Sequence, residues 1–261
     1  MNPPAVGEPG ERSRGAAPAQ RLGKARRSWP GWFVTFEGPE GSGKTVQAAR
    51  LRDLVAAAGI AVLVTREPGG TAVGELIRGI LMNAGHDAVP LGPRTDALLF
   101  NAARAQHVAD VLRPALERGE VVICARYADS TLAYQGYGSG LSIDALRELE
   151  RLAIDGLRPD LTILLDLAPE IGLARKGGDE LQRFESGMDL AYHRRVREGF
   201  QAIAAGEPDR VVTVDAGADV DAVFDRIRSA VTRLAGLERL AAVRPDPAID
   251  EPRSSAVRMD R

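Results

Sequence analysis

Short apolar runs alternate with longer stretches of helical periodicity through the middle of the chain. The runs are continuous rather than interrupted by polar residues, and they lie at Trp32–Phe36, Ala61–Thr65, Val121–Cys124, Leu161–Asp166 and Val211–Asp215. Continuous apolar runs of this kind are typical of strands that are buried on both faces of a parallel sheet. The pattern therefore predicts a sheet at the centre of the molecule.

Helical periodicity fills the intervals between these runs. The predicted helices are Lys44–Ala58, Ala72–Met82, Arg94–Glu117, Ser142–Gly156, Pro169–Lys176, Leu190–Ala204 and Val220–Leu234. A strand followed by a helix, repeated along the chain, indicates parallel strands joined by right-handed crossovers. We therefore predict one doubly wound α/β domain over residues 31–235, with helices on both faces of the sheet and ligands at the carboxyl ends of the strands.

The two ends of the chain differ from this middle part. Residues 1–30 are rich in Pro, Gly, Ala and Arg and contain few large apolar side chains, so we predict a disordered tail. Its excess of basic residues suits either a solvated segment or an arm that binds nucleic acid or an acidic partner. Residues 236–261 contain proline and balanced charges, and we predict a second tail there.

Composition narrows the possible compartments and partners. The 261 residues carry a formal net charge of −2, so the chain lacks the global positive charge of a nucleic-acid-binding protein. The single cysteine, Cys124, excludes an intramolecular disulfide and a zinc cluster of several thiolates, and it fits a reducing, cytoplasmic location. No apolar run approaches the ~20 residues of a membrane span, and the N-terminus lacks an apolar signal-peptide stretch.

A glycine-rich loop follows the first predicted strand and opens the first predicted helix. Its pattern is G-x-x-x-x-G-K-[ST], formed by Gly38, Pro39, Glu40, Gly41, Ser42, Gly43, Lys44 and Thr45. Glycines let the backbone approach phosphate oxygens, and successive N–H groups at the helix N-terminus present positive dipoles to them. Lys44 can reach the β and γ phosphates, and the Thr45 hydroxyl can bind Mg²⁺. The sequence therefore predicts an ATP or GTP site.

Other motifs and the length of the chain narrow the class of phosphate-loop protein. The chain lacks the N-K-x-D motif with which GTPases of the Ras type specify guanine. A motor or AAA-type ATPase would be larger and would end the third strand in an acid, whereas this strand ends at Ala125. A small-molecule kinase fits the length best.

Three further segments contribute arginines and aromatic residues near the predicted strand ends. They are residues 65–71 with the nearby Arg78, residues 99–107, and residues 125–136. Arginine forks bind phosphate bidentately. Phe100 and Arg104 are four residues apart on one helix face, where they could stack on a base and bond its edge, although core packing is the alternative for Phe100.

These motifs resemble the bacterial thymidylate kinase family. The matching stretches are FVTFEGPEGSGKT, TREPGGT, RTDALLFNAARAQHV, ARYADSTLAYQGYGSGL, GLRPDLTILLDLAPEIGLAR, and LQRFE followed by YHRRVREGF; they cover residues 32–205 in family order. The resemblance implies a nucleoside monophosphate kinase fold with a five-stranded parallel core and a helical lid. It also implies a homodimer, with ATP, Mg²⁺ and dTMP as its small-molecule partners and ADP and dTDP as products.

The resemblance also implies roles for individual residues in binding dTMP. Glu40 would meet the deoxyribose 3′-hydroxyl, Arg78 and Arg126 would hold the acceptor phosphate, and Phe100 would stack on thymine. Arg104 would bond an exocyclic oxygen of the base, Thr131 and Gln135 would lie near the base edge, and Tyr134 would disfavour a 2′-hydroxyl. Glu67 lies within a matched motif either as a ligand contact or as an acid that orders its loop.

The segment after the fourth predicted strand resembles the family's lid. Gly177 and Gly178 permit a hinge, and residues 173–185 are rich in charge. The phosphate loop contains no arginine, and in the family such loops go with lid arginines. The resemblance therefore implies that Arg175 and Arg183 join Lys44 and Arg126 in acting on the transferred phosphoryl group, with Lys176 as a third lid candidate. The alternative is a mobile, solvated basic segment.

One departure from the family pattern concerns the third strand. The family usually places Asp before the Arg-Tyr pair, where it helps to hold Mg²⁺, and this chain has Ala125 there. Phosphoryl transfer depends mainly on positioning and charge neutralisation, so the alanine could slow the reaction without abolishing it. Three hypotheses for the function follow: an active dTMP kinase, a nucleotide-binding paralogue with impaired catalysis, or a kinase for another monophosphate such as dUMP.

Overall fold

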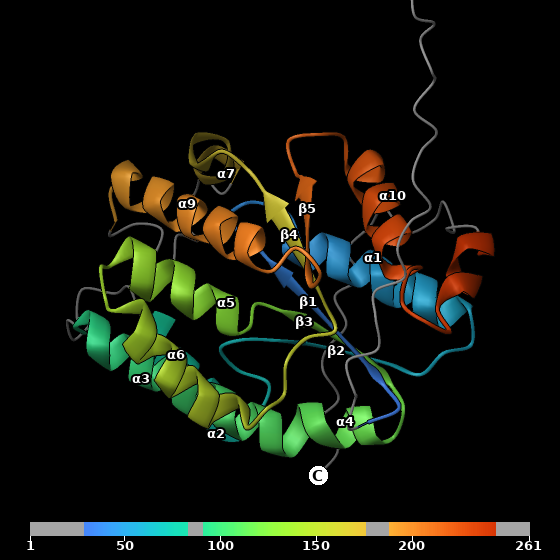
Figure 1. Cartoon of the computed structure of the whole chain (residues 1–261), viewed down its shortest axis with the longest axis horizontal. Helices are drawn as coiled ribbons and strands as arrows, with labels where there is room; N and C mark the ends of the chain where they lie inside the picture. Colours follow the sequence, from blue (N-terminus) through green and yellow to red (C-terminus); the bar gives the residue numbers. More distant parts are fainter. Residues whose placement is uncertain (1–28, 83–90, 176–187, 244–261) are drawn as a thin grey trace, which may run out of the picture.

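A parallel five-stranded sheet organises the computed structural model, which describes residues 29–82, 91–175 and 188–243 (Figure 1). The strand order is β2-β3-β1-β4-β5, and each neighbouring pair is parallel. The strands are β1 (Trp32–Glu37), β2 (Val62–Arg66), β3 (Val121–Ala125), β4 (Leu161–Asp166) and β5 (Val211–Asp215). Every strand begins and ends within one residue of its expected position, which confirms the predicted doubly wound sheet.

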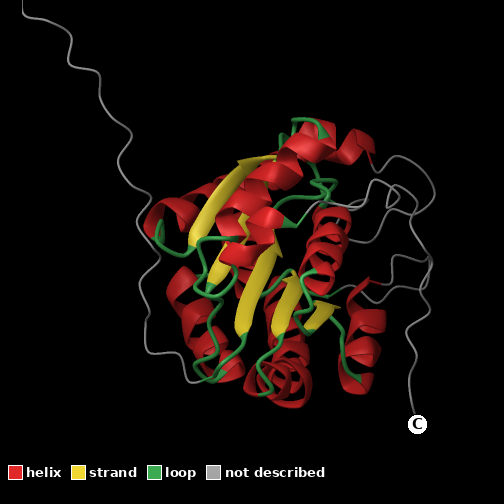
Figure 2. Ribbon diagram, turned by 90° about the vertical axis from the view of Figure 1, so that its right-hand side faces the viewer, coloured by secondary structure: helices red, strands yellow, loops and turns green. Residues whose placement is uncertain are grey.

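Helices cover both faces of the sheet, as Figures 1 and 2 show. One face packs against α1 (Lys44–Ala57) and α10 (Val220–Val231), and the opposite face packs against α3 (Pro93–His107), α4 (Arg113–Glu117), α6 (Ile143–Ile154) and α9 (Leu190–Gly206). Val34 and Phe36 point to the first face and Phe33 to the second, because successive strand side chains alternate. Two more helices, α2 (Ala72–Met82) and α7 (Pro169–Arg175), lie beside the carboxyl ends of the strands.

Two helical segments differ from the prediction. The helix predicted over 94–117 is α3 and α4 joined by a π-helical stretch, η1 (Val108–Leu112). A further helical stretch, α5 (Ala128–Thr131) continued by the π-helical η2 (Leu132–Gly138), was not predicted, because the glycines at 136 and 138 favour helices poorly. Packing on α9 overrides this preference: a Cβ at Gly138 would lie 2.7 Å from Tyr192.

The packed chain extends beyond the predicted domain boundary at residue 235. Leu237 and Leu240, at the start of and within the 3₁₀ turn η3 (Glu238–Ala242), are buried in the same core cluster as α1 and α10. At the other end Trp29, placed in the predicted tail, packs against the core cluster that contains Phe33. The rest of the two predicted tails, 1–28 and 244–261, lies outside the described residues.

Within the described part of the chain, no helix combines the length and the apolar character that crossing a membrane requires.

Candidate active site

A cavity of about 410 Å³ opens at the carboxyl ends of β1, β2 and β3. It is lined by most of the predicted site residues, namely Glu40, Gly41, Ser42, Gly43, Lys44, Thr45, Arg78, Phe100, Arg126, Thr131, Tyr134, Gln135 and Arg175. Arg66, Glu67, Pro68, Met82, Ala125 and Ser130 also line it. The structure therefore brings the phosphate loop and the three arginine-bearing segments together around one space.

The phosphate loop depends on glycine at defined positions. Gly38, Gly41 and Gly43 have φ values of 138°, 68° and 87°, a region that other residues rarely adopt. A Cβ at Gly41 would lie 2.1 Å from the Gly172 carbonyl oxygen of α7, and one at Gly38 would lie 2.4 Å from the Leu165 carbonyl oxygen of β4. The loop is therefore seated directly against β4 and α7, with no room for side chains between.

Lys44 curls back over this loop. Its Nζ donates hydrogen bonds to the carbonyl oxygens of Gly38 at 2.9 Å and Pro39 at 2.7 Å, and to Ser42 Oγ at 3.2 Å. Gly38 and Pro39 thus hold Lys44 through their carbonyl groups and do not themselves line the cavity. The ammonium group is kept at the cavity wall, where its charge faces any bound phosphate.

Arg126, Glu40 and Tyr134 form a cluster that joins the phosphate loop, through Glu40, to the segment after β3. Arg126 Nη2 and Tyr134 Oη donate to Glu40 Oε1 at 2.5 and 2.8 Å, and the guanidinium lies 4.9 Å from the centroid of the Tyr134 ring. Burial alone would lower the pKa of Arg126, but the negative charge of Glu40 outweighs it and the pKa is raised. Arg126 therefore remains a cation at every working pH.

Two more arginines, Arg66 and Arg78, add positive charge to the cavity wall that contains Arg126. Arg78 Nη1 donates to the Pro68 carbonyl oxygen at 3.0 Å, and Arg66 Nη2 lies 3.0 Å from both carboxylate oxygens of Glu75. Burial lowers the pKa of Arg78, and the charges of Arg66 and Arg126 lower it further. Mutual repulsion among three guanidinium groups is relieved by an anion, so the wall suits a phosphate. Sequence reasoning assigned no role to Arg66.

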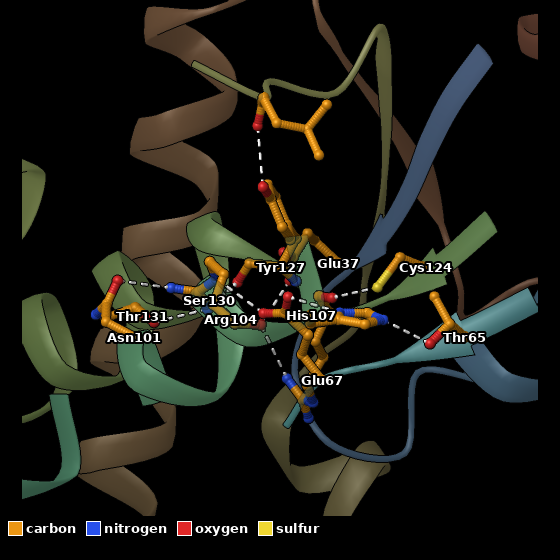
Figure 3. Close-up of polar contacts among 12 residues, drawn as sticks. Glu37, Thr65, Glu67, Asn101, Arg104, His107, Cys124, Tyr127, Ser130 and Thr131 are labelled. Carbon is orange, nitrogen blue, oxygen red and sulfur yellow. Dashed lines mark hydrogen bonds and ion pairs between the residues drawn. The ribbon is translucent and has the colours of Figure 1, made fainter. Parts of the chain in front are cut away.

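Below the cavity lies a buried polar network around Glu67 (Figure 3). Arg104 Nε donates to Glu67 Oε2 at 2.8 Å, and His107 Nδ1 lies 3.1 Å from Glu67 Oε1. His107 Nε2 also hydrogen-bonds Thr65 Oγ1 at 2.7 Å. The carboxylate lines the cavity while both its oxygens have partners in the interior, so Glu67 orders its loop. The role of His107 was not expected from the sequence.

Arg104 differs from its expected place beside the base. Its side chain is 1% exposed, and the residue does not line the cavity, although Phe100 on the same helix does. Arg104 Nη2 donates to the Tyr127 carbonyl oxygen at 3.0 Å and to Thr131 Oγ1 at 3.1 Å. Arg104 therefore reaches the cavity wall through Glu67 and Thr131, and its direct bond to a thymine oxygen stays a prediction.

Glu37 is a buried acid that sequence reasoning placed in no site. It ends β1 directly before the phosphate loop and is 1% exposed. Its Oε1 accepts from the Tyr127 backbone N–H at 2.7 Å, and its Oε2 accepts from Ser130 Oγ at 2.6 Å. Burial, reinforced by the charge of Asp129, raises the pKa of Glu37 to about 7. A charged residue at the end of an apolar run was the signal available in the sequence.

Cys124 lies beside the same segment. Its Sγ donates to the Arg126 carbonyl oxygen at 3.1 Å, and the side chain is fully buried. Burial raises the pKa of the thiol well above its ordinary value. Cys124 is therefore a structural donor rather than a reactive thiol.

The lid is described only at its start. Arg175 Nη1 donates to the Ala216 carbonyl oxygen at 3.2 Å and lines the cavity beside the phosphate loop. The other lid candidates, Lys176 and Arg183, and the Gly177–Gly178 pair lie outside the described residues.

The cavity offers few ligands for a metal ion. Thr45 presents a hydroxyl and Ala125 only a methyl group, and no cluster of three or more His, Cys, Asp or Glu in the described residues could hold a metal. This donor set does not suit a metal caged by protein. It is compatible with Mg²⁺ carried largely by nucleotide phosphates and water, and Thr45 as a metal ligand stays a prediction.

Comparison with known proteins identifies the family. A sequence profile of the family described as thymidylate kinase matches residues 36–227. The chain is 50% identical over 216 residues to a thymidylate kinase of Synechococcus sp. (strain JA-3-3Ab), which covers 82% of this chain and 100% of that protein. It is 53% identical over 205 residues to one of Thermomicrobium roseum (78% and 95%) and 51% identical over 205 residues to one of Deinococcus radiodurans (77% and 97%). With its parallel sheet, its phosphate loop and its arginine-rich facing wall, the chain belongs to the thymidylate kinase family.

Proposed function

We propose that this chain transfers the γ-phosphoryl group of ATP to dTMP and releases ADP and dTDP. One observation carries the proposal beyond family membership. The phosphate loop with Lys44 and the two arginines Arg78 and Arg126 line the same cavity. A donor triphosphate and an acceptor monophosphate can therefore meet in one space.

On the donor side, the backbone N–H groups of Gly38–Thr45 and the N-terminus of α1 bind the phosphates of ATP. Lys44, which donates to two loop carbonyl oxygens and to Ser42 Oγ in this structure, turns its ammonium group to the phosphate oxygens. The Thr45 hydroxyl holds Mg²⁺, which neutralises charge on the β and γ phosphates when it is bound.

On the acceptor side, the side chains that line the cavity suit a deoxynucleoside monophosphate. Phe100 offers a ring for the base, and Thr131 and Gln135 offer polar groups for its edge. Arg78 and Arg126 bind the 5′-phosphate. Glu40 accepts from the 3′-hydroxyl, and Tyr134, packed beside it, leaves a 2′-hydroxyl no space.

The chemical step needs no covalent intermediate with the protein. An oxygen of the acceptor phosphate forms a bond to the γ-phosphorus, and the bond from that phosphorus to the β–γ bridging oxygen breaks, leaving the electron pair on ADP. Lys44, Arg126 and the lid cations Arg175 and Arg183 stabilise the charge on the equatorial oxygens in the transition state. Binding of both nucleotides in line supplies most of the remaining effect.

The homodimer and the cytoplasmic location belong to the same proposal. The homodimer is inferred from the family resemblance, and the cytoplasmic location from the single cysteine. Sedimentation of the purified chain, with and without dTMP, measures the oligomeric state.

The test is an assay of ADP release with a panel of nucleoside monophosphates, combined with calorimetric binding of ATP and dTMP. We expect the highest kcat/KM with dTMP. A higher value with dUMP or another monophosphate would reassign the substrate. Binding of both nucleotides with no turnover of any monophosphate would support the impaired paralogue instead.

A further inference from the structure

The backbone of Arg126 has a conformation that requires support. Its φ of 69° lies in the left-handed region, which a residue with a long side chain seldom adopts. This conformation turns the chain sharply between the end of β3 and the start of α5. The guanidinium thereby reaches Glu40 and the cavity, so the direction of Arg126 depends on whatever fixes this turn.

Glu37 fixes the turn from the neighbouring strand. Its two oxygens accept from the N–H of Tyr127, the residue that follows Arg126, and from the hydroxyl of Ser130 in α5. The Arg126 N–H itself donates to the Phe36 carbonyl oxygen at 2.9 Å, which joins the turn to β1 one residue earlier. Two successive residues of β1 thus hold two successive N–H groups of the turn.

The side chains of Glu37 and Arg126 are not hydrogen-bonded to each other. The side-chain hydrogen bonds of Arg126 go to Glu40 and, more weakly, to the Gly38 carbonyl and Ser130 Oγ at 3.3 and 3.4 Å, and none goes to Glu37. Glu37 therefore acts on Arg126 through the backbone. Tyr127 is also held from the protein interior, because its carbonyl oxygen accepts a hydrogen bond from the buried Arg104.

We propose that Glu37 is a positioning residue that sets the direction of Arg126 toward the acceptor monophosphate through the Tyr127 N–H and the Ser130 hydroxyl. The inference rests on the proposed function, in which Arg126 binds the acceptor phosphate. It requires two hydrogen-bonding oxygens or their equivalents rather than a negative charge. An amide in the same place retains one acceptor for the Tyr127 N–H and gives Ser130 Oγ a donor.

The experiment compares Glu37→Ala and Glu37→Gln with the wild type. We measure KM for dTMP and for ATP, kcat, the calorimetric Kd for dTMP and the Tm. Glu37→Ala should raise the KM and Kd for dTMP roughly 10- to 100-fold, by analogy with the effect of removing a residue that orients a metal ligand. The KM for ATP should stay within about twofold, and Glu37→Gln should recover dTMP binding to within about threefold of the wild type.

Thr35→Val is the matched control. Thr35 lies two residues earlier on β1, is 1% exposed, and hydrogen-bonds Thr162 Oγ1 at 2.7 Å, so it is equally buried but is not joined to the Arg126 turn. We expect a lower Tm with an unchanged KM for dTMP. Ser130→Ala, which removes only one of the two bonds, is the second variant if Glu37→Ala does not fold, and it should raise the Kd for dTMP severalfold.

Several results would overturn the inference. These are equal changes in the two KM values, a Glu37→Gln variant as weak as Glu37→Ala, or a Thr35→Val variant that loses dTMP affinity to the same degree. Failure of the proposed function is seen separately, as a wild type that does not phosphorylate dTMP. In that case the Kd for dTMP still decides the role of Glu37.

Discussion

The two sides of the cavity are built in different ways. The proposed donor side is a loop of consecutive residues, and its cation, Lys44, is held by carbonyl oxygens of the loop itself. The acceptor side combines side chains from β1, β2, α3 and the β3–α5 turn, and its arginines are held by residues far away in the sequence. A local site can be recognised from its motif, whereas a dispersed site depends on the fold.

The difference also concerns burial. Lys44 lies at an open mouth, but Glu37, Glu67, Arg104 and His107 are all less than 5% exposed. Buried polar groups are costly unless their partners are complete, so changes on the acceptor side should affect folding as well as binding. A change at Lys44, whose partners are loop carbonyl groups at the cavity, should affect catalysis with little effect on folding.

The largest effect is expected on the donor side. Lys44→Met removes the cation that faces the transferred phosphoryl group and should lower kcat by about 10²- to 10³-fold, the range found for loss of one preorganised donor. The calorimetric Kd for dTMP and the Tm should stay near those of the wild type. Arg50→Met, on the same helix but paired with Asp221, is the control. A large loss of dTMP affinity with Lys44→Met would contradict the division between the two sides.

Ionisation of Glu37, which supports the acceptor side, should make the free energy of unfolding depend on pH. The pKa of Glu37 is raised from 4.5 to about 7 on folding. The contribution of Glu37 to the free energy of unfolding is therefore fully present below pH 4.5 and is lost as the pH rises through 7. Glu37→Gln cannot ionise. Between pH 4.5 and 8 its free energy of unfolding should therefore increase relative to the wild type by up to about 3 kcal/mol.

Urea denaturation of both proteins at pH 5 and pH 8 measures this difference, because other titrating groups cancel between them. A difference that is constant with pH would show that Glu37 keeps an ordinary pKa in the folded chain.

Ala125 lies where the two sides meet. It lines the cavity and pairs in register with Phe36, close to the phosphate loop. Ala125→Asp should raise kcat by roughly 10- to 100-fold and lower the Mg²⁺ concentration for half-maximal activity, because residues around a bound metal often contribute that much. Ala125→Asn tests whether the charge is needed. An unchanged kcat and Mg²⁺ midpoint would mean that Thr45 and the phosphates hold the metal sufficiently.

The smallest effect is expected from the residue that we propose to stack on the thymine base, Phe100. Phe100→Ala removes a ring from the acceptor wall and should raise the KM for dTMP about tenfold, since stacking of one base on an aromatic ring contributes about 1–3 kcal/mol. The KM for ATP should stay within about twofold. Leu98→Ala on the same helix, where the side chain is exposed, is the control. Equal effects of Phe100→Ala on both substrates would place Phe100 in the core instead.

The sequence predicted the elements that depend on local pattern. The strands follow from continuous apolar runs, and the phosphate loop follows from glycine spacing, because both signals lie within a few consecutive residues. The positions of Arg78, Phe100 and Tyr134 at the cavity came from the family resemblance, since no local pattern brings them together.

What the sequence did not predict depends on packing between distant segments. The helical stretch at 128–138 forms because Gly138 and Gly199 allow close contact between η2 and α9. Glu37 and His107 gain their roles only when β1 lies beside the β3–α5 turn and α3 lies beneath β2. Arg104 was expected at the surface of the cavity, and the pull of Glu67 and Thr131 holds it behind the wall.

The burial of Cys124 makes the chain convenient for site-specific labelling. It is the only cysteine in the sequence, and neither solvent access nor thiolate character is available to a maleimide or an iodoacetamide. A single cysteine introduced at an exposed position, such as Glu117 at the end of α4, should therefore react alone in the folded protein. Fluorophores or spin labels can be attached in this way without first replacing a native residue beside the Arg126 turn.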